Sequence, residues 1–114
     1  MESAVYQYNA LCTRVIDGDT VELVVDVGFN IRHTIRGRLY NVDAPELFSG
    51  NDKDNARKAK EYLDELVLGK TVVVNTYKDK MSFNRWIVEI RSLNGESINE
   101  QVSTFCQQLS ASLV

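Results

Sequence analysis

The sequence lacks the features on which many small or membrane-bound proteins depend. Among its 114 residues there are one proline, one histidine and two cysteines, and no apolar run approaches the roughly 20 residues that cross a bilayer. Cys12 and Cys106 do not lie in a Cys-x-x-Cys or Cys/His spacing, which excludes the usual zinc motifs and a framework of several disulfides. We expect two buried, reduced thiols, with one long-range disulfide as the alternative.

An excess of positive charge is also absent. Thirteen Lys and Arg stand against sixteen Asp and Glu, which gives a net charge of −3. General electrostatic attraction to nucleic acid is therefore excluded, and any phosphate binding must be local. The segment Met1-Glu2-Ser3 has no basic residue, and no apolar run follows it, so it does not resemble a secretory signal. The expected location is the cytoplasm, although a processed or truncated chain would look the same.

The composition that remains is that of an ordinary globular domain, with 44% apolar and 25% charged residues. A chain of 114 residues buries a sufficient core without disulfides or a structural metal. We find no internal repeat, low-complexity tract or linker. We therefore expect a single domain over residues 1–114.

Alternating and helical apolar patterns divide the chain into seven elements. Strands are predicted over residues 5–16, 21–27, 30–40, 70–77 and 86–90, and helices over residues 56–67 and 98–113. The order β-β-β-α-β-β-α predicts an α+β fold, a five-stranded closed or partly closed barrel with helices covering its ends. In the second strand the odd positions, including Val27, are expected to be buried. In the third strand we expect Ile31 and His33 on the apolar side and Arg32, Arg36 and Arg38 on the solvent side.

Two polar segments stand out, Ile16-Asp17-Gly18-Asp19-Thr20 and residues 38–46, which run from Arg38 to Glu46. Asp19 and Asp43 are the candidate metal ligands, because hard divalent cations take carboxylate and carbonyl oxygens. Arg38 and Asp43 are five residues apart, so in a regular strand their side chains would lie on opposite faces. Both can serve one site only if the chain bends between them, and Asn41 and Ala44 are the expected positions of that bend.

Taken alone, each segment has a simpler interpretation. Residues 17–19 suit a two-residue hairpin turn, and residues 43–46 suit a loop with a helix-initiating proline.

In combination the segments are more specific. Residues 16–20, residues 38–46, Asn84-Arg85-Trp86 and Ile98-Asn99-Glu100 resemble the staphylococcal nuclease (thermonuclease) family in order, spacing and residue type. The resemblance spans about residues 9 to 111. It implies an OB-fold barrel and Ca²⁺-dependent hydrolysis of phosphodiesters in DNA and RNA that leaves 3′-phosphate ends.

The resemblance also implies a role for individual residues. Asp19 and Asp43 match the ligands of a single Ca²⁺, assisted by the backbone carbonyl of Ala44, where the family often has threonine. Glu46 matches the glutamate that orients or deprotonates the attacking water. The two arginines that grip the scissile phosphate match Arg38 and Arg85, and a guanidinium suits this role because its planar fork donates two parallel hydrogen bonds.

The chain departs from the family before its second arginine and near its last helix. Phe83 replaces a tyrosine, so one phosphate hydrogen bond is expected to be lost, and Asn84 replaces a glycine. A second tyrosine is replaced around Ser112. We therefore expect weaker substrate binding. Arg32 and Arg36 lie on the same side of their strand as Arg38 and would partly compensate if they contact the substrate. The alternative is that both are solvated arginines with no role in binding.

Two other functions compete with a nuclease. A non-catalytic OB-type module would bind nucleic acid or protein, and a structural domain would bind calcium only for stability. The presence of all five residues, Asp19, Arg38, Asp43, Glu46 and Arg85, favours the enzyme, because a degenerate module would have lost several. Trp86 is interpreted as core packing, with base stacking as the alternative.

Overall fold

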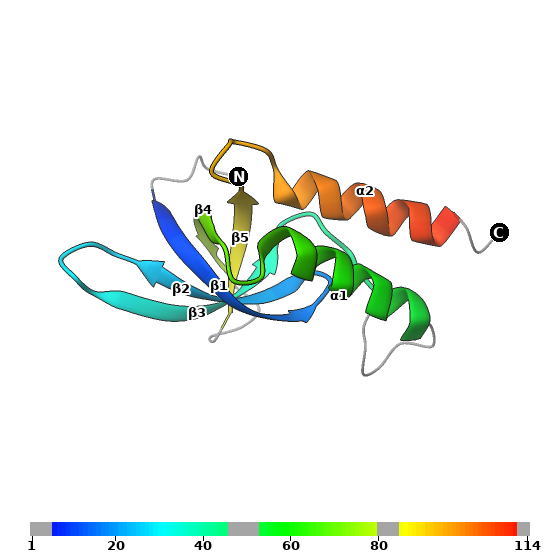
Figure 1. The fold of residues 1–114 in the computed structure, drawn as a ribbon, viewed down its shortest axis with the longest axis horizontal. Coiled ribbons are helices and arrows are strands. Elements are labelled where there is room, and N and C mark those ends of the chain that lie inside the picture. The colour runs from blue at the N-terminus through cyan, green and yellow to red at the C-terminus, as the bar shows by residue number, and fades with distance from the viewer. Residues whose placement is uncertain (1–5, 46–52, 80–84, 112–114) are drawn as a thin grey trace.

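The computed structural model describes residues 6–45, 53–79 and 85–111 (Figure 1). Its elements follow the predicted order of three strands, a helix, two strands and a helix. They are β1 (Gln7–Asp17), β2 (Thr20–Asp26), β3 (Arg32–Leu39), α1 (Lys53–Val67), β4 (Thr71–Lys78), β5 (Arg85–Arg91) and α2 (Ile98–Ala111).

The five strands close into a barrel in the order β1-β2-β3-β5-β4. The long strand β1 pairs antiparallel with both β2 and β4, and the parallel pair of β3 with β5 completes the closure. An irregularity in β1 between Cys12 and Arg14 gives this strand the bend that pairing with two partners requires. This topology is consistent with an OB-fold and confirms the predicted architecture.

Alternate residues of each strand fill the barrel. Val21, Leu23 and Val25 of β2 are buried, as the alternating pattern predicted. Helices α1 and α2 lie against each other, with the rings of Tyr62 and Phe105 stacked at a centroid distance of 4.2 Å. Figure 1 shows both helices on the side of the molecule opposite the β2–β3 hairpin.

The outer part of the β2–β3 hairpin differs from the prediction. Val27 is 37% exposed and Ile31 is 55% exposed, and His33 is exposed as well. The hairpin extends beyond the barrel (Figure 1), so the apolar side of these strands has nothing to pack against there. In β3 the prediction is right only from Ile35 to Leu39, where the strand closes the barrel.

Both cysteines are free and buried, which confirms the prediction of reduced thiols. Trp86 is partly buried and packs against the core, with Lys78 Nζ 4.8 Å from its ring centroid. Within the described ranges, neither helix has the length and apolar character to cross a membrane.

Candidate active site

The site is organised by the turn between β1 and β2. The strand register pairs Asp17 with Thr20 and leaves Gly18 and Asp19 as a two-residue turn. A Cβ atom on Gly18 would lie 2.7 Å from Ala59 Cβ and 2.9 Å from Ala44 Cβ. Gly18 is therefore needed because α1 and the chain after β3 pack directly onto the turn.

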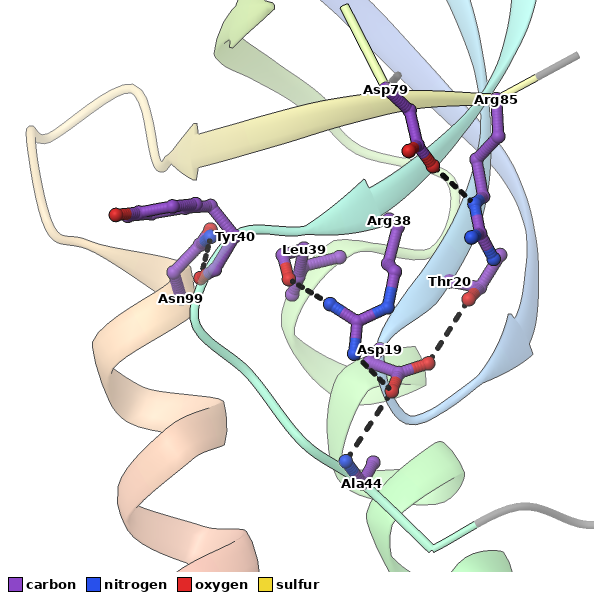
Figure 2. Close-up of polar contacts among 9 residues, drawn as sticks. All are labelled: Asp19, Thr20, Arg38, Leu39, Tyr40, Ala44, Asp79, Arg85 and Asn99. Atoms are coloured by element: carbon purple, nitrogen blue, oxygen red, sulfur yellow. Dashed lines mark hydrogen bonds and ion pairs between the residues drawn. The ribbon is translucent and has the colours of Figure 1, made fainter. Parts of the chain in front are cut away.

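Asp19 joins this turn to the end of β3 (Figure 2). Its Oδ2 accepts a hydrogen bond from the Ala44 amide at 3.3 Å and lies 3.7 Å from Arg38 Nη2. Its Oδ1 accepts a hydrogen bond from the Thr20 hydroxyl at 3.0 Å, and its backbone carbonyl accepts one from the Leu39 amide at 2.7 Å. The Asp19 side chain is 13% exposed, so this carboxylate has a fixed position near the surface.

The bend expected between Arg38 and Asp43 is present. Strand β3 ends at Leu39, and Asn41 adopts a left-handed backbone conformation with φ of 61°. Asparagine tolerates this conformation better than most residues do. Val42 and Ala44 are buried beyond the bend, whereas Asp43 is exposed.

The two acidic candidates are linked through Ala44. Asp43 directly precedes Ala44, whose backbone amide donates to Asp19 Oδ2 at 3.3 Å. The pKa of Cys106, in α2, is raised to about 11, first by burial and then by the negative charges of Asp19 and Asp43. Both carboxylates disfavour the ionised form of this thiol, and the contact of Asp19 with Ala44 brings the chain at Asp43 to the β1–β2 turn.

The two candidate phosphate-binding arginines lie on neighbouring strands. In the parallel pair of β3 with β5, Arg38 is the partner of Ile87, two residues after Arg85. In Figure 2 both arginine side chains extend to the same side of this strand pair. Arg38 Nη1 also donates to the Leu39 carbonyl at 3.3 Å, and Arg85 Nε donates to Asp79 Oδ2 at 2.9 Å.

The remaining candidate, Glu46, lies outside the described residues, as do Phe83, Asn84 and Ser112. In the part of the chain that the structure describes, no group of three or more His, Cys, Asp or Glu side chains forms a metal-binding cluster. Of the donors expected from the sequence, the described ranges contain the carboxylates of Asp19 and Asp43 and the backbone carbonyl of Ala44. These oxygen donors fit a hard cation such as Ca²⁺ and do not suit zinc.

Two residues that support the site were not identified as site residues from the sequence. The buried Asp79 contacts Arg85 across a six-residue separation that no sequence pattern marks. Asn99 was noted only as part of a motif. Its Oδ1 accepts a hydrogen bond from the Ile90 amide at 2.8 Å, and its Nδ2 donates to the Tyr40 and Val88 carbonyls at 3.0 Å each. Asn99 thus fixes the start of α2 to β5 and to the chain that follows β3.

The sequence model of the family described as "Staphylococcal nuclease homologue" matches residues 36–104, more than half of the chain. This chain belongs to the staphylococcal nuclease family. The match includes the end of β3, all of β5 and the start of α2, the elements that carry Arg38, Arg85 and Asn99.

The chain is also similar to proteins named as endonucleases. The chain is 34% identical over 87 residues to a protein named "Uncharacterized endonuclease" from Escherichia coli O157:H7, an alignment that covers 76% of this chain and 50% of the relative. It is 31% identical over 106 residues to Endonuclease YhcR of Bacillus subtilis (strain 168), covering 85% of this chain and 8% of that protein. The chain thus spans about half the length of the Escherichia coli relative and a small part of the Bacillus protein.

Proposed function

We propose that this chain is a metal-dependent nuclease that hydrolyses phosphodiester bonds in DNA, RNA or both. The observation that supports this most is the convergence on Asp19, whose carboxylate meets Arg38 and the Ala44 amide while Arg85 lies on the adjoining strand. A carboxylate that can bind a cation, beside two guanidiniums, provides the positive charge that stabilises a phosphodiester during hydrolysis. Family membership and relatives named as endonucleases support the same function.

The arginines are proposed to bind the scissile phosphate. In-line attack increases the negative charge on the non-bridging oxygens, and two guanidinium forks stabilise that charge more in the transition state than in the ground state. Arg85 Nε already donates to Asp79, which leaves its terminal nitrogens for a phosphate. Arg38 is one-third exposed, so a substrate reaches it from solvent.

Asp19 and Asp43 are proposed to hold one Ca²⁺, with the carbonyl of Ala44 as a third ligand. The exposed position of Asp43 and the shallow burial of Asp19 leave both carboxylates accessible to an ion. A bound Ca²⁺ would supply positive charge beside the reacting phosphate and make a nearby water more acidic.

Glu46 is proposed to orient or deprotonate the attacking water. In the sequence it lies two residues after Ala44 and three residues after Asp43. A carboxylate in this role accepts a proton from water as the new phosphorus–oxygen bond forms. We expect the bond between phosphorus and the 5′ oxygen to break, so that the products carry 3′-phosphate ends.

Cleavage of end-labelled single-stranded DNA and RNA tests the proposal directly. We expect the purified protein to cleave with Ca²⁺, not with chelator, and we expect Asp43→Ala to abolish cleavage. Asp54→Ala, which removes an exposed carboxylate from α1, is the matched control and should cleave normally. Folded protein that cleaves under no condition, in Ca²⁺ or Mg²⁺, would contradict a nuclease and favour a non-catalytic OB-type module.

A further inference from the structure

A third arginine, Arg36, lies beside the two proposed phosphate ligands. It is the direct partner of Arg85 in the parallel pairing of β3 with β5. In β3 the buried residues Ile35, Gly37 and Leu39 alternate with Arg36 and Arg38, so both arginines are on the outer face of the barrel. Arg36, Arg38 and Arg85 therefore form one group of guanidiniums, which we call the arginine group.

Arg36 differs from the other two in its surroundings. Arg38 lies near the Asp19 carboxylate, and Arg85 pairs with Asp79. Arg36 is exposed, and its guanidinium makes no hydrogen bond or ion pair with any residue in the described ranges. Its cross-strand partner in β2 is Glu22, whose carboxylate accepts a hydrogen bond from the Thr13 hydroxyl at 3.0 Å.

This arrangement has an energetic consequence. Two like charges directly opposite each other on neighbouring strands destabilise a sheet. The charge of Arg85 is offset by Asp79, but Arg36 remains next to it without an ion pair of its own. Anions bound at Arg36 and at Arg85 reduce this repulsion, which makes the position beside Arg36 favourable for a phosphate of its own.

We propose that Arg36 binds a second phosphate of a single-stranded oligonucleotide, next to the scissile phosphate held by Arg38 and Arg85. Residues i and i+2 of a strand are about 7 Å apart, a spacing similar to that of successive phosphates along an extended single strand. The inference rests on the proposed nuclease function and adds a subsite to it. It assigns to Arg36 the recognition of a chain of phosphates rather than of one phosphodiester.

The binding test uses Arg36→Ala with Arg32→Ala as the matched control. Arg32 is exposed on the same side of β3, opposite Asp26 at the far end of the hairpin, and its loss removes the same charge. A labelled single-stranded oligonucleotide is titrated at several salt concentrations with chelator present, so that no cleavage occurs. For Arg36→Ala we expect roughly fivefold to tenfold weaker binding. The slope of log K against log salt should also decrease by about 0.7, the value for one phosphate contact to a single strand.

One further variant and the control make the result more specific. Arg36→Lys should recover most of the salt slope, because an ammonium retains the charge that releases counterions. Arg32→Ala should leave both affinity and slope unchanged. The proposed subsite would be overturned if Arg36→Ala and Arg32→Ala weakened oligonucleotide binding equally, or if neither weakened it. Thermal unfolding of each variant confirms that the exposed substitutions leave the fold intact.

A cleavage test separates this inference from the function on which it rests. With an oligonucleotide, Arg36→Ala should raise KM and leave kcat unchanged. With a nitrophenyl ester of a thymidine phosphate, which has a single phosphodiester, neither constant should change. Wild-type protein that cleaves both substrates while Arg36→Ala behaves like wild type would overturn the subsite alone. Wild-type protein that cleaves neither would overturn the nuclease, and the titrations in chelator would still decide whether Arg36 binds phosphate.

Discussion

Arg85 Nε donates a hydrogen bond to Asp79 Oδ2 at 2.9 Å, and only 5% of the Asp79 side chain is exposed. The pair links Asp79, the residue directly after β4, to Arg85, the first residue of the neighbouring strand β5. Because a buried carboxylate has little freedom to move, it fixes the direction in which the guanidinium points. Asp79 is therefore a positioning residue for the proposed phosphate site.

The first prediction concerns Asp79→Asn, which keeps an oxygen acceptor and removes the charge. Arg85 should lose its fixed orientation, and small misplacements of a binding group reduce rates by up to about a hundredfold. We expect kcat for oligonucleotide cleavage to fall roughly tenfold or more with a smaller change in KM. Asp64→Asn, which breaks the Lys60–Asp64 ion pair of α1, is the control and should retain wild-type kcat. An unchanged kcat in Asp79→Asn would show that Asp79 does not position Arg85.

Arg85→Lys tests whether the guanidinium fork itself is needed. Lysine keeps the charge but cannot donate two parallel hydrogen bonds to one phosphate. We expect a loss in kcat on the order of 10²–10³, the usual effect of removing one donor to a transition-state oxyanion. Arg91→Lys, at the exposed opposite end of β5, should have wild-type kinetics. Equal activity of the two variants would exclude Arg85 from the reaction.

Glu46→Gln should separate metal binding from chemistry. The amide is similar in size to the carboxylate but does not accept a proton from water, so cleavage should decrease roughly 10²–10⁴-fold. Ca²⁺ should still raise the unfolding temperature of this variant, because Asp19 and Asp43 are intact. The two quantities are measured on one preparation beside Glu61→Gln, an exposed change in α1. A variant that cleaves at the wild-type rate would remove Glu46 from the mechanism.

Much of the site was predictable because its main features are local in sequence. The two-residue turn at Gly18 and Asp19 follows from turn composition, and the bend at Asn41 follows from the need to reconcile Arg38 with Asp43. The order of elements also follows from apolar periodicity. Each of these features depends on a short segment of the chain, so it can be predicted from the sequence.

The errors concern residues whose surroundings are set only when the chain has folded. Val27 was expected to be buried, and His33 was expected on the apolar side of its strand, because alternation alone does not show where a hairpin leaves the barrel. Asp79 was not identified because only the folded barrel brings it to Arg85. Gly18 was interpreted through turn chemistry, whereas the structure shows that its missing side chain makes room for Ala44 and Ala59.

Gly18→Ala tests that packing role. The new Cβ would approach Ala59 Cβ to 2.7 Å and Ala44 Cβ to 2.9 Å, so α1 or the chain after β3 must move. Overpacking of this kind costs about 1–3 kcal/mol, and we expect the unfolding temperature to decrease by several degrees. Because Ala44 moves with its neighbours, Ca²⁺ should also stabilise this variant less than it stabilises the wild type. Unchanged stability in a urea titration would contradict the close approach.

The last prediction concerns the two buried thiols at alkaline pH. Burial raises the pKa of Cys12 and of Cys106 from 9.0 to about 11, and nearby carboxylates add to the effect. Because the folded state holds these protons more tightly, their contribution to stability is complete below pH 9 and is lost as the pH rises toward 11. Between these pH values the free energy of unfolding should decrease by about 1.4 kcal/mol per pH unit for each thiol, because the thiol ionises in the unfolded state before it does so in the folded state.

Urea unfolding of wild type and Cys106→Ala between pH 8 and pH 10.5 measures this contribution. Tyr77 also has a raised pKa, chiefly through its hydrogen bond to Glu89, so it too makes stability depend on alkaline pH. Its effect is common to both proteins and cancels in their difference. The stability difference between the two proteins should therefore stay constant up to about pH 9 and then shrink, since only the wild type loses the contribution of Cys106. A difference that stays constant throughout would mean that the Cys106 thiol ionises as easily in the folded chain as in the unfolded one, which its burial beside Asp19 and Asp43 argues against.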